Sequence, residues 1–163
     1  MDERIELVPH DPSWAAKFET EADLSKERLG NWAQFVSHVG STAIPSIKAK
    51  PIIDIVIESK VYPPSKTVVE LLESMSYALR GEAGVSGRVW FTKGSPRKFN
   101  LNWCPESGEV SQAQIRFRDA LKLNSELARK YESLKVAAAG DLHIDSYEYA
   151  DAKTDFVSKV VAE

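Results

Sequence analysis

The sequence predicts an α/β (α+β) fold, in which helices flank a β-sheet and the C-terminal portion is helical. Three observations predict it. A helix pattern opens the chain, short apolar strand patterns then alternate with one further helix, and the last third carries helical patterns alone. The chain has 163 residues, of which 43% are hydrophobic, so we expect one compact domain over residues 1–163 that buries most of its apolar surface.

The first helix and the two strands after it have distinct local signals. Asp11 can cap exposed amides, Pro12 supplies a preset φ at the helix start, and apolar residues at fourfold spacing predict a helix to about Leu29, ended by Gly30. Residues 33–39 predict a strand that the Gly-Ser-Thr at 40–42 interrupts. Residues 52–57 are apolar on both faces, so they predict a central strand.

The remaining elements follow from periodicity. Apolar residues after Pro63 and Pro64 recur at helical spacing up to Met75, whereas the glycine-bearing residues 81–87 predict a loop. Residues 89–92 and 99–104 predict two strands joined by a turn at 93–97, with Asn100, Asn102 and Cys104 on one face of the second. Three helices should follow, at about 110–123, at 127–138 and at 149–160.

Composition excludes several classes of protein. No apolar stretch of about 18 residues exists and no secretory signal pattern opens the chain, so we expect a cytoplasmic protein without a membrane span. One cysteine, Cys104, and three histidines rule out an internal disulfide and a Cys/His zinc site. A bound metal would therefore be held mainly by oxygen ligands.

The charge is unevenly distributed. The net charge is −3, which argues against binding to duplex nucleic acid, yet residues 88–135 carry ten basic residues against five acidic ones. This basic middle segment is either a solvated surface or a local attraction for a phosphate-bearing small molecule.

The most informative stretch is HVGSTAIPSIKAKPIIDI, residues 38–55. Gly40 allows a ligand to approach the backbone closely, and Ser41, with the amides that follow it at Thr42, can donate hydrogen bonds to phosphate oxygens. Asp54 lies among aliphatic neighbours, where an ionised carboxylate needs a compensating cation or donor. The alternative is a structural Asp54, paired with Lys50 or capping a helix.

The sequence resembles the GrpB (UPF0157) family, which belongs to the nucleotidyltransferase superfamily of polymerase-β-like folds. The resemblance covers nearly the whole chain. It rests on the signature above and on four further segments: IELVPHDPSWAAKFETEADLSKERLG, WFTKGSPRKFNLNWC, QIRFRDALKLNSELARKYESLK and YADAKTDFVSKV. It implies a nucleotidyltransferase-like mixed sheet, a Gly-Ser turn that binds a nucleotide triphosphate, and strand carboxylates that hold divalent metal.

Carried over residue by residue, the resemblance assigns the turn to Gly40 and Ser41 and the first Mg²⁺ or Mn²⁺ ligand to Asp54. The second carboxylate position falls on Val56, which cannot coordinate a metal. Glu58, two residues further along the same face, would substitute only if the strand bends or the metal shifts. The chain also departs from the His-Leu-His common in the later strand, because it has Asn100 and Asn102 in those places, and asparagine does not exchange a proton near neutral pH.

Further candidates each have two interpretations. His38 matches the family's signature histidine and is either a ligand group or a strand histidine with ordinary hydrogen bonds. Lys50 can approach Asp54 or a phosphate. Lys93 and Arg97 flank a turn and either contact an anion or stay in solvent, and Arg118 is the arginine of its helix that we expect to face a cleft. Trp90 and Trp103 either stack on a base or fill the core.

Two main functions fit these residues. The first is transfer of a nucleotidyl group from a nucleoside triphosphate to a small acceptor, with Asp54 and Ser41 as catalytic residues and Mg²⁺ or Mn²⁺ as cofactor. The alternative is a catalytically degenerate module that binds a nucleotide or a coenzyme A-like ligand. The apolar stripes of the C-terminal helices fit either the core or a homodimer.

Overall fold

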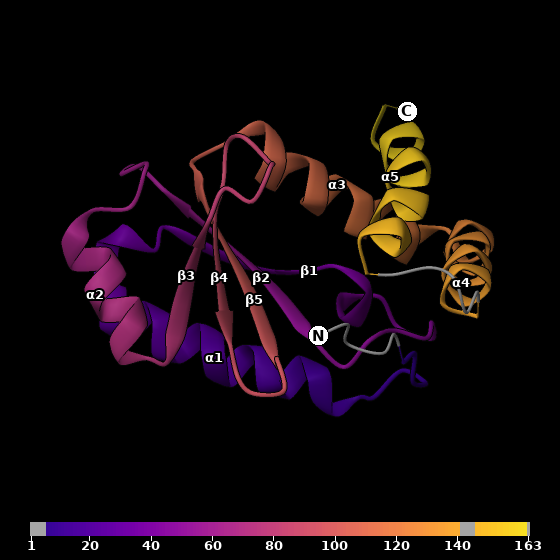
Figure 1. Ribbon diagram of the computed structural model, residues 1–163, viewed down its shortest axis with the longest axis horizontal. Coiled ribbons are helices and arrows are strands. Elements are labelled where there is room, and N and C mark those ends of the chain that lie inside the picture. Colours follow the sequence, from indigo (N-terminus) through magenta and orange to yellow (C-terminus); the bar gives the residue numbers. More distant parts are fainter. Residues whose placement is uncertain (1–5, 141–145, 163) are drawn as a thin grey trace.

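The protein is described by a computed structural model that covers residues 6–140 and 146–162. Its centre is a five-stranded mixed sheet with the strand order β1-β2-β5-β4-β3, and Figure 1 shows α1 along one side of the sheet and α3, α4 and α5 gathered on the other. The predicted fold class is therefore confirmed.

One side of the sheet is covered by α1 (Ser13–Leu29) and α2 (Lys66–Ser74). Asp11 caps α1, because its Oδ1 accepts a 2.8 Å hydrogen bond from the Ser13 amide, and Gly30 ends the helix with a φ of 57°. The buried side chains of Trp14 and Phe18 on α1 belong to the largest apolar cluster of the protein, together with Ile53, Ile55 and Ile57 of the sheet.

The sheet is antiparallel except at its centre. β1 (Phe35–Val39) runs antiparallel to β2 (Ile53–Ser59), and β2 pairs in parallel with β5 (Phe99–Pro105). β4 (Val89–Lys93) and β3 (Tyr77–Gly81) complete it with antiparallel pairing. In this register Asp54 lies opposite Asn100, so both side chains lie on the same face of the sheet, away from α1.

The second face is covered by α3 (Glu109–Leu123), α4 (Ser125–Ala139) and α5 (Ser146–Ala162). Their apolar side chains pack within the chain: the ring centroid of Tyr131 lies 5.0 Å from that of Phe117 and 5.5 Å from that of Phe156. The described part of the stripes therefore contributes to a core within the chain, which is one of the two alternatives expected for them. Among the described residues, no helix combines the length and the apolar character needed to cross a bilayer.

The structure adds one strand that the sequence pattern does not predict. β3 is an edge strand in which Tyr77 is buried but Leu79 is half exposed, so the alternation that marks a half-buried strand is missing. The first strand also begins later than predicted, at Phe35, because Gly30–Trp32 form a 3-10 turn in which Ala33 N–H donates to the Gly30 carbonyl.

Candidate functional site

Gly40 forms a sharp bend directly after β1. Its backbone has a φ of 75° and a ψ of −173°, a conformation that essentially only glycine adopts, and the 3-10 turn η2 (Ser41–Ala43) follows. A Cβ atom placed on Gly40 would lie 2.3 Å from Oδ2 of Asp54. The bend and the carboxylate are therefore in direct contact, and glycine is needed both for the backbone angle and for the space.

Two neighbouring strands fix the orientation of Asp54. Asn100 Nδ2 donates a 3.0 Å hydrogen bond to Asp54 Oδ1, and Trp90 Nε1 donates a 3.1 Å hydrogen bond to Asn100 Oδ1. The nitrogen and the oxygen of the Asn100 side-chain amide thus each have a defined partner, and these partners fix the orientation of the side chain. The pair holds Oδ1 of Asp54 toward β5 and leaves Oδ2 beside Gly40.

Three lysines surround this carboxylate. Burial raises the pKa of Asp54 above its ordinary 3.8, and the hydrogen bond from Asn100 opposes that shift. The positive charges of three lysines oppose it as well: Lys153 on α5, Lys135 on α4, and Lys50 just before β2. The region around Asp54 therefore carries more positive than negative charge.

The lysines themselves are perturbed by the same surroundings. Burial, followed by the charge of Lys153, lowers the pKa of Lys135 to about 7. Burial also lowers the pKa of Lys153, and the charge of Asp54 partly opposes this effect. An anion that entered here would stabilise the protonated form of both lysines.

These residues line a pocket of about 280 Å³ between the sheet and the C-terminal helices. Asn102 connects two of its walls, since Arg88 donates to Asn102 Oδ1 at 3.3 Å and Asn102 Nδ2 donates to Gln114 Oε1 at 3.4 Å. The described residues that line it come from strands, the bend and all three helices of this face: Gly40, Ser41, Asp54, Arg88, Trp90, Asn100, Asn102, Gln114, Phe117, Tyr131, Lys153 and Val157.

Helix α4 also holds the segment that links the bend to β2. Glu132 Oε2 accepts a 2.5 Å hydrogen bond from the Lys48 amide, and Lys135 Nζ donates a 2.6 Å hydrogen bond to the Lys48 carbonyl. Closer to the pocket, burial raises the pKa of Tyr131 to about 12, while hydrogen bonding with the Ser41 side chain partly opposes that shift. The helical layer is therefore attached to the bend and to the segment that follows it.

The donor set does not fit a centre with two metal ions. Val56 has no exposed surface and packs in an apolar cluster with Val39 and Cys104. Glu58 is buried two residues further along β2, where its Oε2 accepts hydrogen bonds from the Ser107 amide at 2.8 Å and from Gln112 at 3.4 Å. Within residues 6–140 and 146–162, no three carboxylate, cysteine or histidine side chains gather in a geometry that could hold a metal.

His38 lies on the opposite side of the sheet from Asp54. It pairs with Ile55 in the register, its ring stacks on Phe18 of α1 at 4.8 Å, and its Nε2 lies 2.9 Å from the Thr42 hydroxyl. Burial, followed by the charge of Arg118, lowers the pKa of His38 to about 4. A neutral His38 thus supports the turn through Thr42, from behind the pocket.

Two further predicted cations are also held away from the pocket. Lys93 forms a 2.8 Å ion pair with Glu21 of α1, which also accepts a hydrogen bond from the Tyr77 hydroxyl. Arg118 donates to the His38 carbonyl at 3.0 Å and pairs with Asp119 at 2.9 Å. Both side chains serve the packing of the fold in this structure, and neither lines the pocket that contains Asp54.

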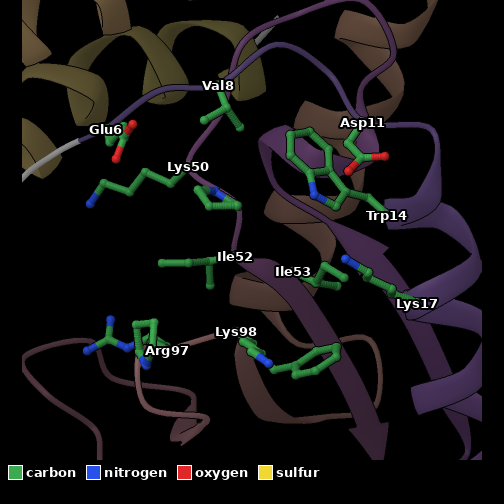
Figure 2. Close-up of a pocket in the computed structure, with 13 residues that line it drawn as sticks. Glu6, Val8, Asp11, Trp14, Lys17, Lys50, Ile52, Ile53, Arg97 and Lys98 are labelled. Carbon is green, nitrogen blue, oxygen red and sulfur yellow. The ribbon is translucent and has the colours of Figure 1, made fainter.

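Arg97 and Lys50 line a second, larger hollow of about 800 Å³, which Figure 2 shows in close-up. The guanidinium carbon of Arg97 also lies 5.2 Å from the ring centroid of Trp90, a residue of the smaller pocket. The predicted tryptophans separate in the same way: Trp103 is fully buried in the core, whereas Trp90 lines the pocket.

Sequence reasoning missed the contributions of Arg88, Gln114, Tyr131 and Lys153. Three of them lie on the C-terminal helices, and helical periodicity does not tell which face of a helix meets a site far away in the sequence. The available signal was the resemblance itself, because its last segment, residues 149–160, includes Lys153.

Comparisons with known proteins identify the family to which the chain is similar. A family model described as "GrpB protein" matches residues 4–163. A UPF0157 protein of Halalkalibacterium halodurans is 34% identical over 161 residues, which cover 96% of this chain and 80% of that protein. The UPF0157 protein YqkA of Bacillus subtilis is 30% identical over 94% of this chain, and the chain spans only 45% of YqkA.

A solved structure has the same architecture. The crystal structure of the conserved protein GrpB from Enterococcus faecalis matches with a TM-score of 0.81 and 27% identity, over 96% of this chain and 95% of that one. A shorter similarity, 37% identity over 76 residues, covers 45% of this chain and 19% of a dephospho-CoA kinase from Mycolicibacterium paratuberculosis.

Proposed function

The chain belongs to the GrpB family, and we propose that it binds a phosphate-bearing small molecule of the nucleotide type in the pocket between Gly40 and Asp54. The observation that carries this proposal is the charge of the pocket. The charges of three lysines act on one buried carboxylate, and two basic residues, Lys153 and Arg88, line the pocket itself. A multiply charged anion is the ligand that would compensate these groups.

The bend places Gly40 and Ser41 in the lining of the pocket, where the Asp54 carboxylate lies against Gly40. Ser41 lies in the same lining as Tyr131 of α4, and its hydroxyl can donate to a phosphate oxygen. We assign Ser41 and Lys153 to the phosphate oxygens, with Asn102 and Arg88 at the next part of the ligand. The charge of Asp54 favours the protonated form of Lys135 and Lys153, against the effect of burial.

The nucleotide part of the proposal rests on two supports. The resemblance to the polymerase-β-like nucleotidyltransferases assigns the Gly-Ser turn to a triphosphate, and one relative of this chain is named as a dephospho-CoA kinase. Dephospho-coenzyme A, coenzyme A and ATP share an adenosine phosphate, so they form one ligand class for the test.

We favour binding without metal chemistry over the two-metal mechanism of that superfamily. Val56 has no coordinating atom, and Glu58 is already engaged by the Ser107 amide. Lysines supply the positive charge that a second metal ion would otherwise supply. The affinity for a triphosphate should therefore persist when divalent ions are removed.

Calorimetric titration tests this proposal directly. Inorganic triphosphate, ATP and dephospho-coenzyme A are titrated into the protein in EDTA and, separately, in Mg²⁺. We expect binding in both buffers, with about tenfold weaker affinity in Lys153→Gln than in the wild type, since one charged contact is worth about 1.5 kcal/mol. Lys159→Gln is the matched control, because Lys159 is exposed on the same helix. Absence of binding for all three molecules would refute the proposal.

Nucleotidyl transfer is the second candidate function. One observation favours it: the Oδ2 of Asp54, the residue to which the resemblance assigns the first metal ligand, lies against the glycine bend. The test is release of pyrophosphate from each of the four nucleoside triphosphates in Mg²⁺ or Mn²⁺ with a panel of small acceptors. Release that is abolished in Asp54→Asn would support transfer, and binding without release would support the binding module.

A further inference from the structure

The larger hollow lies at the start of β2 and β5, where α1 begins. Its volume is about 800 Å³, within the range of roughly 300–1,000 Å³ that is typical of small-molecule sites. Apolar side chains form much of its lining, including the indole of Trp14, the ring of Phe99 and the aliphatic chains of Ile52 and Ile53. Such walls suit the hydrocarbon or aromatic body of a ligand.

Most of the charged residues that line this hollow are basic. Figure 2 shows Ile52 between Lys50 and Arg97 on one side, with Lys17 on the other side near Ile53. Lys98 adds a fourth cation, whereas two acidic residues, Glu6 and Asp11, line the same hollow. Asp11 is committed to capping α1 through its hydrogen bond with the Ser13 amide. The charges thus favour an anionic group on the ligand.

The larger hollow and the smaller pocket are lined by neighbouring residues of the same two strands. Ile53 and Phe99 line the larger hollow, and the residues directly after them, Asp54 and Asn100, line the smaller one. Because side chains alternate between the faces of a strand, these two pairs lie on opposite faces of the sheet. The larger hollow is therefore a separate site, although the charge of Lys50, which lines it, acts on Asp54.

We propose that the larger hollow binds a small organic acid with an apolar or aromatic body, as a second ligand of the protein. The apolar walls receive the body and Arg97, Lys50 and Lys98 receive the acid group. Binding of the acid rests on this hollow alone and goes beyond the proposed function.

The test compares two ligands of equal shape. 1-Naphthoate and its uncharged amide, 1-naphthamide, are titrated by calorimetry into the wild-type protein. We expect the acid to bind with a Kd below about 1 mM and about tenfold more tightly than the amide. Equal affinity of the two, or no binding of either, would overturn the proposal.

Variants then locate the acid. Arg97→Gln should weaken naphthoate about fivefold while leaving the amide unchanged, and Ile52→Trp should fill the hollow and prevent binding of both. Lys66→Gln, at an exposed lysine of α2, is the matched control and should change neither. Thermal unfolding checks that Ile52→Trp is folded, and Arg97→Gln provides an independent result. Naphthoate binding that survives both variants would refute the assignment to this hollow.

A Gly40→Ala variant separates this inference from the proposed function. It should lose triphosphate binding and keep naphthoate binding, because Gly40 does not line the larger hollow. If the wild type binds naphthoate but no triphosphate, the proposed function fails and the acid site stands. If it binds triphosphate but no naphthoate, the acid site fails alone.

Discussion

Replacing Gly40 with alanine tests the contact on which the candidate site depends. The added Cβ would lie 2.3 Å from Asp54 Oδ2, 3.0 Å from its Cγ and 3.1 Å from its Cβ. The bend and the carboxylate cannot both stay in place. A shift of the carboxylate would strain its hydrogen bond with Asn100, which holds the other oxygen of Asp54. We therefore expect Gly40→Ala to lose both stability and phosphate binding.

The expected loss of stability in Gly40→Ala has two parts. A non-glycine residue at a φ of 75° and a ψ of −173° costs about 1–3 kcal/mol of backbone strain. Forcing an extra carbon into an occupied volume costs about 1–3 kcal/mol more. The free energy of unfolding should fall by about 4 kcal/mol in total, which is a large share of the roughly 5–15 kcal/mol of a typical domain.

Gly30→Ala provides the matched control for the backbone part. Gly30 also has a positive φ, 57°, but a Cβ there meets no atom within 4 Å. Urea unfolding of both variants should show that Gly40→Ala costs about 2 kcal/mol more than Gly30→Ala. In a double-mutant cycle with Asp54→Ala, most of this excess should disappear, because the two atoms nearest to the new Cβ, Oδ2 and Cγ of Asp54, are removed.

Equal losses in the two glycine variants would refute the reasoning. So would a coupling below about 0.5 kcal/mol between positions 40 and 54, since residues in direct contact couple by more than that. Either result would mean that the carboxylate does not lie against the bend, and the proposed phosphate pocket would lose its geometry.

Three further predictions follow from the described contacts. The lowered pKa of His38, about 4 against an ordinary 6.5, means that the folded state resists protonation more than the unfolded state, so stability present above pH 6.5 is lost as the pH falls toward 4. Between pH 7.5 and 4.5 the free energy of unfolding in urea should fall by about 1.5 kcal/mol more in the wild type than in His38→Gln. The full pKa difference would give about 2.5 kcal/mol, and we reduce it because the ring is partly exposed. Equal losses in the two proteins would contradict this prediction. Val56→Asp should lower the midpoint of thermal unfolding and create no Mg²⁺ site, because it buries a charge in an apolar cluster, and a gain in Mg²⁺ affinity by calorimetry would contradict this. With a pKa of about 7, Lys135 must take up a proton to attract an anion above that pH, so triphosphate affinity should fall about tenfold from pH 7 to 9 in the wild type and not in Lys135→Gln.

The sequence predicted which residues of one strand share a face better than it predicted which face of the sheet a residue of another strand occupies. Asn100 and Asn102 alternate with apolar residues, so their shared face followed from the strand period, and the structure brings both to the pocket of Asp54. His38 precedes the bend by two residues, yet its side depends on the pairing register of β1 with β2. A shift of one residue would have reversed its side.

The cations around Asp54 were the least predictable part of the site. Lys93 was predicted as an anion contact from its place beside a turn, but β4 directs it toward α1, where Glu21 is its partner. Lys153 is 99 residues from Asp54 in the chain and approaches it only because α5 packs on α3 and α4. Such contacts depend on how helices pack, which local spacing does not encode.

The backbone N–H and C=O of Lys48 are both bonded by side chains of a single helix, Glu132 and Lys135 of α4. Any shift of α4 along or across its axis must therefore pull on the backbone on both sides of the Lys48 Cα, and only seven residues separate Lys48 from Gly40. A truncated chain that stopped at Leu123 would retain all five strands but lose this tether. The loop beside the carboxylate is thus anchored by two side chains that lie 84 and 87 residues after Lys48 in the chain.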